Sequence, residues 1–174
     1  SKSSNVVAAK LTADLGVSRV IRAARDLGIS TPIANEASVA LGTSSVSLLE
    51  LTSAYAAVAN GTYPVRPAGL GESDNADDWL AQRLGGATRF PQRELDDLRG
   101  MLRGVIERGT GRSAALPIPA YGKSGTTQDG RDALFVGWAG DLVVGVWIGN
   151  DDNSPSPGLA GGGLPARLWR DFMV

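Results

Sequence analysis

Apolar and polar residues in the first two thirds of the chain repeat with the period of amphipathic helices. This pattern predicts helices over about 6–15 and 18–27, each ended by a glycine, and a longer one from Pro91 to about Arg108. The inward faces expected are Val20, Ile21, Ala24 and Leu27 in the second helix, and Leu95, Leu98, Leu102, Val105 and Ile106 in the longest. Residues 32–43 lack this period and predict a loop.

Another helix is predicted by the pair Ser47-x-x-Glu50, which has the spacing of a capping box. Asn60-Gly61 should end this helix. Its apolar face would consist of Leu48, Leu51, Tyr55 and Val58. Because Tyr55 belongs to that stripe, we expect it to pack in or near the core and not to act as an acid or base.

After Ala120 the pattern becomes that of β-strands. A polar strand over 123–127 leads into a turn, and two β-rich runs over 133–138 and 142–148 follow with a tight connection between them, which predicts an antiparallel meander of three strands. A loop rich in Gly, Pro and Ser follows, and Pro165 suits the first turn of a last helix. That helix should carry Leu168, Trp169 and Phe172, while Trp138 and Trp147 of the meander are assigned to packing. The order of elements predicts an α+β fold, an antiparallel sheet packed with helices.

Two stretches invite ligand-binding interpretations that their spacing does not support. The acidic residues Glu72, Asp74, Asp77 and Asp78 lack the spacing of an EF-hand loop, so a solvated surface segment is expected and no metal site is predicted. Residues 109–112, Gly-Thr-Gly-Arg, lack the Gly-Lys-Ser/Thr of a phosphate-binding loop.

Composition narrows the function further. The 174 residues are 43% hydrophobic with a formal net charge of -1, and the cationic residues form no basic run, so no nucleic-acid partner is expected. The chain has no His and no Cys, which excludes a Ser-His-Asp triad, a cysteine nucleophile and His or Cys zinc sites. Acid–base chemistry must therefore use carboxylates, tyrosines or lysines, and no cofactor is predicted.

Lys123-Ser124-Gly125-Thr126-Thr127 concentrates a cation and three hydroxyls at the start of the meander. On a strand, side chains alternate between faces, so Ser124 and Thr126 should point one way and Lys123, Gly125 and Thr127 the other. Hydroxyl and backbone donors beside an ammonium suit a substrate carboxylate and an oxyanion. From these residues alone, a Ser/Thr-rich strand beside a turn remains an alternative.

Two short motifs occur in the order found in penicillin-binding proteins: Ser3-Ser4-Asn5 before a helix, and Lys123-Ser124-Gly125 on a later strand. Residues 40–61 (ALGTSSVSLLELTSAYAAVANG), 109–112 (GTGR) and 131–138 (RDALFVGW) strengthen the match. The chain resembles the C-terminal part of the transpeptidase domain of class A (bifunctional) penicillin-binding proteins. The resemblance covers residues 1–174 as part of a single domain and is weakest over 69–88.

One element of the family pattern is absent from the sequence. The family's nucleophile and its general-base lysine lie in Ser-x-x-Lys, but Val7 and Ala120 stand three residues before Lys10 and Lys123. Lys2 has no residue at that position. We therefore expect this chain to require an upstream segment of the same domain that supplies Ser-x-x-Lys, and to be inactive without it.

The resemblance implies roles for the motif residues. Ser3 would relay a proton to the leaving nitrogen, and Asn5 would hold the substrate's peptide group and the catalytic lysine. Lys123 would supply positive potential, which lowers the pKa of a neighbouring lysine and favours anions.

The remaining motif residues would bind substrate. The hydroxyls of Ser124 and Thr126 would hold a carboxylate, and the Thr126 N–H would form half of an oxyanion hole. Gly125 would let substrate approach the strand closely, and Thr127 completes the predicted substrate-binding set.

By resemblance, the substrates would be peptidoglycan stem peptides ending in D-Ala-D-Ala, with β-lactam antibiotics as inhibitors. The expected location is extracytoplasmic, with a membrane-anchored parent protein that also has a glycosyltransferase domain. A serine β-lactamase or DD-carboxypeptidase of the same fold, and a non-catalytic β-lactam sensor or scaffold, remain alternatives.

Overall fold

The computed structural model describes residues 3–67 and 86–174, which form two compact units. One, here called the helical unit, lies within residues 5–92, and the other, the strand unit, combines Ser3 and Ser4 with residues 93–174. The acidic residues 72–78 considered above lie outside the described residues. Each unit is described by itself.

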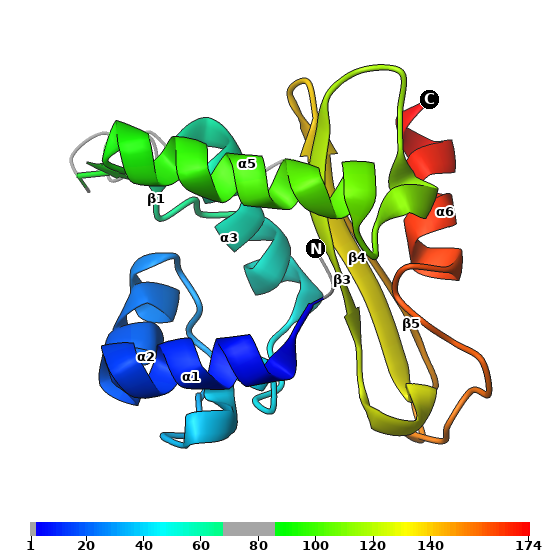
Figure 1. Ribbon diagram of the computed structural model, residues 1–174, viewed down its shortest axis with the longest axis horizontal. Coiled ribbons are helices and arrows are strands. Elements are labelled where there is room, and N and C mark those ends of the chain that lie inside the picture. Colours follow the sequence, from blue (N-terminus) through cyan, green and yellow to red (C-terminus); the bar gives the residue numbers. More distant parts are fainter. Residues whose placement is uncertain (1–2, 68–85) are drawn as a thin grey trace, which may run out of the picture. The chain divides into compact units, whose positions relative to one another are not determined.

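Among its described residues, the helical unit contains three α-helices (Figure 1). Its elements are α1 (Asn5–Leu15), α2 (Val17–Asp26), the 3-10 helix η1 (Ala37–Leu41), α3 (Leu48–Asn60), and the short strands β1 (Thr62–Tyr63) and β2 (Thr88–Arg89). The predicted helices are confirmed to within a residue or two, and the expected inward face of α2 is half-buried. Two expectations were wrong: the stretch 32–43 contains η1, and β1 pairs with β2 where no strands were predicted. Strands of two residues are too short to show an alternating pattern.

The predicted capping box at the start of α3 is confirmed. The Ser47 hydroxyl accepts a hydrogen bond from the Glu50 N–H at 3.1 Å, and the Glu50 carboxylate accepts from the Ser47 N–H at 3.4 Å. The same carboxylate accepts from the backbone N–H groups of Ser30 (2.7 Å) and Thr31 (3.0 Å) and from both of their hydroxyls. These bonds, first the one from the Ser30 hydroxyl, hold the pKa of Glu50 far below its usual value. Glu50 therefore ties the segment after α2 to the start of α3.

Replacing Glu50 by Gln should lower the melting temperature at neutral pH, because a neutral amide cannot match a carboxylate as acceptor for the five donors named above. A carboxyl group with a depressed folded-state pKa stabilises the fold above its unfolded pKa of about 4.3, and this stability is lost as the pH falls. The difference between Glu50→Gln and wild type should therefore shrink below about pH 4. Thermal melts at pH 7 and pH 3 test this, with Glu36→Gln, whose carboxylate contacts only the Ser38 hydroxyl among described residues, as control. Equal melting of Glu50→Gln and wild type at pH 7 would contradict it.

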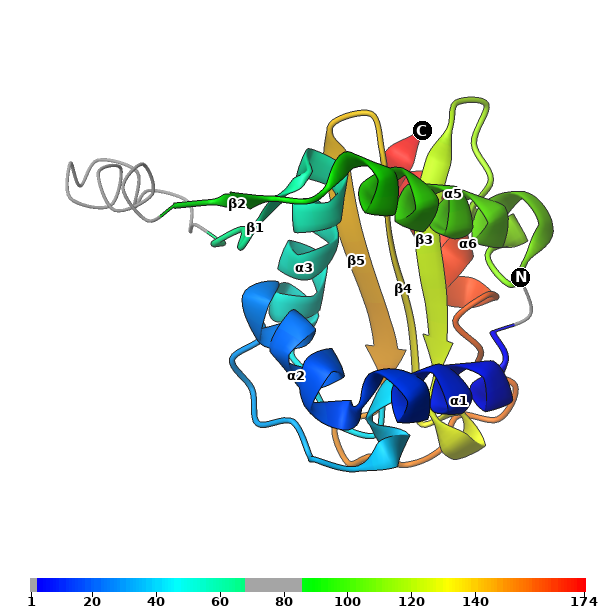
Figure 2. The ribbon, with the colours of Figure 1, turned by 60° about the vertical axis from the view of Figure 1, so that its left-hand side comes forward.

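The strand unit is built on a three-stranded antiparallel sheet of order β3-β4-β5 (Figures 1 and 2). Its elements are α5 (Gln92–Arg108), the 3-10 helices η2 (Arg112–Ala114) and η3 (Gln128–Gly130), β3 (Ala120–Thr126), β4 (Asp132–Ala139), β5 (Leu142–Gly149) and α6 (Leu164–Met173). The predicted meander is confirmed, with Lys123 opposite Val136 and Phe135 opposite Val146. β3 is an edge strand among the described residues.

The core of the strand unit lies between the sheet and α6, which packs against β4 and β5. Trp169 of α6 is fully buried, with its ring centroid 5.3 Å from that of Phe135, and its indole N–H donates to the Gly137 carbonyl at 3.3 Å. The buried cluster also contains Ile106, Ala114, Ala120, Ala139 and Ala166. The predicted inward residues of α5 are buried, except Leu98, which is half-buried.

Trp147, Leu168 and Phe172 are exposed, and for Trp147 this contradicts the packing role assigned to it. Leu168 and Phe172 are 45% and 67% exposed, because α6 turns Pro165, Ala166 and Trp169 inward. Both sides of this helix carry apolar residues, so periodicity did not distinguish the inner face. Trp147 is 43% exposed and donates its N–H to Asp132 at 3.0 Å, whereas Trp138 is buried and stacks on Tyr121 as expected for a packing residue.

None of the helices in the two described ranges has both the length and the apolar character needed to cross a bilayer.

Candidate active site

The Lys123 ammonium lies at the centre of the candidate site. It donates hydrogen bonds to the Ser3 hydroxyl at 3.0 Å and to the Ser124 carbonyl at 2.7 Å. The structure therefore brings together two of the predicted site residues, which are 120 positions apart in the chain.

Burial lowers the pKa of Lys123 from its usual value, because desolvation disfavours the charged form. No ion pair between described residues involves Lys123. The described partners of the Lys123 ammonium, a hydroxyl and a carbonyl, are neutral and do not cancel its charge. The ammonium can therefore still attract an anion. An approaching carboxylate or oxyanion would in turn stabilise the protonated amine.

Ser3 has a left-handed backbone conformation, with φ of 47°. This region is uncommon for residues other than glycine, and residues held there are concentrated at functional sites. In this conformation the exposed Ser3 reaches Lys123. Asn5 is exposed and is the first residue of α1, and it belongs to the helical unit.

The side chains of Ser124 and Thr126 contact groups other than those near Lys123. The Ser124 hydroxyl lies 2.7 Å from the Thr110 hydroxyl, and the Thr126 hydroxyl accepts a hydrogen bond from the Gly161 N–H at 3.0 Å. Lys123, the neighbour of Ser124 in the strand, contacts Ser3 instead. Neighbouring side chains therefore have different partners, as expected because side chains alternate between the two faces of a strand.

The backbone of β3 alternates in the same way. The Thr127 N–H donates to the Asp132 carbonyl at 2.9 Å, and Thr126 pairs with Ala133 in an antiparallel register. Because successive N–H groups on a strand point to opposite sides, the Thr126 N–H points away from β4, toward the edge that has no strand partner among the described residues. That is the orientation an oxyanion-hole donor needs.

Two predicted substrate-binding residues have structural partners. The Thr127 hydroxyl accepts from the Asp132 N–H at 2.7 Å and lies 3.3 Å from its carbonyl, so it stabilises the turn between β3 and β4. A Cβ on Gly125 would lie 3.0 Å from the Leu134 side chain, so packing by itself favours glycine there.

Tyr55 is half-buried on α3, and burial raises its pKa to about 12. The phenol therefore stays protonated at neutral pH, in keeping with the packing role predicted for it.

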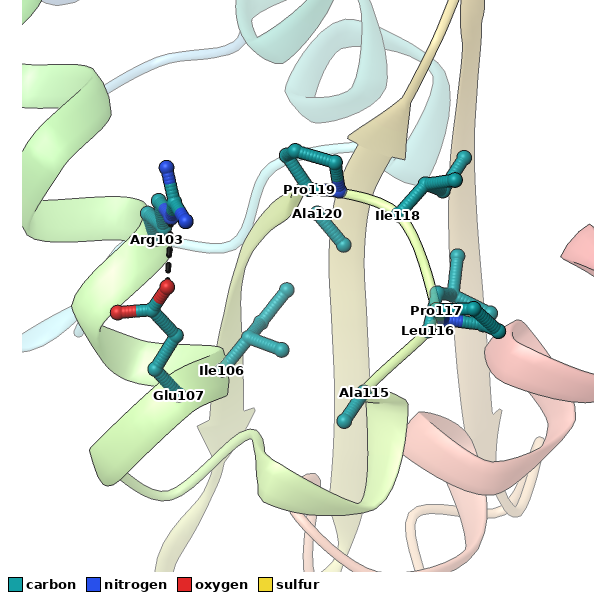
Figure 3. Close-up of a pocket in the computed structure, with 9 residues that line it drawn as sticks. All are labelled: Arg103, Ile106, Glu107, Ala115, Leu116, Pro117, Ile118, Pro119 and Ala120. Carbon is teal, nitrogen blue, oxygen red and sulfur yellow. Dashed lines mark hydrogen bonds and ion pairs between the residues drawn. The ribbon is translucent and has the colours of Figure 1, made fainter.

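A pocket of about 310 Å³ lies at the start of β3 and does not include the candidate site (Figure 3). It is lined by Arg103, Ile106, Glu107 and residues 115–120, and Arg103 pairs with Glu107 at 2.6 Å. None of the predicted site residues lines it. Among the described residues there is also no cluster of acidic side chains suited to a metal ion.

Sequence reasoning missed Thr110 and Gly161 as neighbours of the site. Thr110 lies in the Gly-Thr-Gly-Arg stretch that was noticed for its glycines, and Gly161 begins a run of three glycines that was interpreted as a loop. Both residues contact β3 from other segments of the chain, and the sequence pattern of a single helix or strand does not predict such contacts.

Comparison with known proteins identifies the family and the fold of the chain. The family model of the penicillin binding protein transpeptidase domain matches residues 1–173. Penicillin-binding protein 1A of Aquifex aeolicus is 32% identical over 97% of this chain and 24% of its own length. Penicillin-binding protein 2D of Bacillus subtilis is 29% identical over 98% of this chain and 26% of its own length.

Among solved structures, penicillin-binding protein 1A from Haemophilus influenzae superposes with a TM-score of 0.71 at 20% identity, over 99% of this chain and 32% of that one. This likeness confirms the predicted α+β fold. The chain spans about a quarter of the length of the curated relatives it matches. Since the family model covers residues 1–173, the chain belongs to the penicillin-binding protein transpeptidase domain family, as its resemblance to the class A proteins indicated.

Proposed function

We propose that this chain forms the C-terminal part of a serine DD-transpeptidase domain that cross-links peptidoglycan and is inhibited by β-lactams. The observation that carries the proposal is the contact of the Lys123 ammonium with the Ser3 hydroxyl, on the strand β3 that also presents Ser124 and Thr126 and is an edge strand among the described residues. The nucleophilic serine and the general-base lysine of Ser-x-x-Lys would come from a segment of the same domain outside this sequence.

The reaction would be an acyl transfer in two steps. The serine oxygen forms a bond to the carbonyl carbon of the penultimate D-Ala, the C–N bond to the terminal D-Ala breaks, and a proton passes to the leaving amine. The amine of a second stem peptide then attacks the ester, which releases the serine and forms the cross-link. A β-lactam would acylate the same serine through its ring carbonyl.

In this scheme Ser3 relays the proton to the leaving nitrogen, and its hydrogen bond to Lys123 supports that role because the ammonium orients the hydroxyl oxygen. The Lys123 charge lowers the pKa of the neighbouring catalytic lysine, so that the latter can act as a base near neutral pH. Asn5 would hold the substrate's peptide group.

The edge of β3 would bind the charged parts of the substrate. The Ser124 and Thr126 hydroxyls would donate to its carboxylate, with Gly125 beside it, and the outward Thr126 N–H would donate to the oxyanion together with the N–H of the nucleophilic serine. The Thr127 hydroxyl is bonded within the turn, so we give it no direct part in this binding.

The same proposal locates the domain outside the cytoplasm, because its substrate is cell-wall peptidoglycan. It also gives the parent protein a membrane anchor and a glycosyltransferase domain, in keeping with the class A resemblance.

The proposal is tested with the full-length gene product, a stem peptide ending in D-Ala-D-Ala and an amine acceptor. We expect release of D-alanine together with the transfer product, inhibition by penicillin through a long-lived adduct, and no adduct on the 174-residue chain alone. Release of D-alanine with hydrolysis only would indicate a carboxypeptidase, and rapid release of hydrolysed penicillin a β-lactamase. A stable adduct without any turnover of peptide would indicate a sensor.

A further inference from the structure

The two hydroxyls proposed to bind the substrate carboxylate each have a partner from outside β3. Thr110, in the turn between α5 and η2, places its hydroxyl oxygen 2.7 Å from that of Ser124. Gly161, in the loop before α6, donates its backbone N–H to the Thr126 hydroxyl at 3.0 Å.

These partners determine which way the hydroxyls can donate. A backbone N–H only donates, so the Thr126 oxygen accepts from Gly161 and its own proton remains available for another acceptor. An ionised carboxylate only accepts. If Ser124 donates to a carboxylate, the hydrogen bond between Ser124 and Thr110 must run from the Thr110 hydroxyl to the Ser124 oxygen. Chains of hydrogen bonds of this kind strengthen one another.

We propose that Thr110 and the Gly161 N–H are positioning groups that hold Ser124 and Thr126 as hydrogen-bond donors toward the substrate carboxylate. Neither group touches the substrate, and each acts through the hydroxyl that it contacts. This inference rests on the proposed function, in which Ser124 and Thr126 bind that carboxylate, and adds the two groups that orient their hydroxyls.

The glycines of the loop before α6 allow this loop to pack closely against β3 and against the turn that contains Thr110. A Cβ on Gly161 would lie 2.2 Å from the Gly125 carbonyl oxygen and 2.4 Å from that of Leu134. A Cβ on Gly162 would lie 2.1 Å from the Thr110 carbonyl oxygen. The loop therefore lies directly on the backbone of both the strand and the turn, and only glycine permits this approach.

The test replaces Thr110 by Val, which keeps the shape of the side chain but removes the hydroxyl. In the full-length gene product, the second-order rate constant for acylation by penicillin should fall about 10-fold, because the Ser124 hydroxyl loses the donor that directs its own proton toward the carboxylate and its hydrogen bond to that charged group is weakened. Acylation by the methyl ester of the same penicillin, which has no carboxylate, should change little. The ratio of the two rate constants should therefore fall about 10-fold.

Two variants serve as controls. Thr110→Ser keeps the hydroxyl and should restore the wild-type ratio, and Ser113→Ala removes a hydroxyl from η2, next to the same turn, and should leave the ratio unchanged. An equal loss for acid and ester in Thr110→Val, or no loss for either, would overturn the inference while wild-type acylation still supports the proposed function. If the wild-type protein were acylated by neither compound, the proposed function itself would fail, and the inference with it.

Discussion

Replacing Lys123 by Met in the full-length gene product should slow acylation by penicillin by roughly 10²–10³-fold, the range found when one preorganised charge-stabilising group is removed from an acyl-transfer site. Methionine has a similar length but no charge, so it removes the positive potential at the middle of β3 and the hydrogen bond to Ser3. Lys10, which is exposed on α1, provides the matched control in Lys10→Met. Stopped-flow or quenched labelling with a fluorescent penicillin measures the rates. Acylation of Lys123→Met within a few-fold of wild type would contradict the role given to this ammonium.

The pH dependence of the acylation rate tests whether the charge of Lys123 is needed. Only the protonated amine supplies positive potential, and burial lowers the pKa of Lys123, so the acylation rate should fall on the alkaline side below the usual lysine pKa of about 10.4. In Lys123→Arg the guanidinium stays charged throughout this range, so the alkaline loss attributed to residue 123 should disappear even if the maximum rate is lower. An identical alkaline limb in both proteins would show that another group causes it.

Replacing Trp169 by Ala should destabilise the strand unit by about 3–5 kcal/mol, the usual cost of truncating a buried aromatic side chain. Trp169 is fully buried against Phe135, and its N–H is bonded to the Gly137 carbonyl of β4. Phe172, on the same helix but 67% exposed, is the matched control, and Phe172→Ala should change stability by about 0.5 kcal/mol or less.

Hydrogen exchange of the β4 amides reports this difference locally, because exchange of core amides measures the free energy of opening. Protection in β4 should drop strongly in Trp169→Ala and little in Phe172→Ala. The loop that carries Gly161 precedes α6, so weaker packing of this helix should also reduce the acid-to-ester ratio of acylation. Equal exchange in the two variants would contradict the core assignment.

The parts of the fold that were predicted correctly have local causes. The capping box of Ser47 and Glu50 gives a direct signal for the start of α3, and the runs between 120 and 149 alternate with short turns as a meander requires. The errors arose where local pattern is ambiguous or absent. α6 has apolar residues on two faces, so the sequence did not distinguish the buried Trp169 from the exposed Phe172, and the strands β1 and β2 have two residues each.

The residues of the candidate site also differ in whether local sequence could predict them. Lys123, Ser124 and Thr126 share one strand, so their arrangement follows from alternation, and Ser3 was connected with Lys123 only through the family resemblance. Thr110 and Gly161 reach β3 through contacts between segments 14 and 35 residues apart. Such tertiary hydrogen bonds leave no periodic trace, so only the three-dimensional structure reveals them.

The most direct measurement is to acylate the full-length gene product with penicillin and map the modified peptide by mass spectrometry. We predict a single modified serine outside the 174 residues of this chain, within a Ser-x-x-Lys sequence. A stable penicilloyl group on a serine of this chain, such as Ser3 or Ser124, would contradict the assignment of these residues to the half of the site that receives the substrate without attacking it.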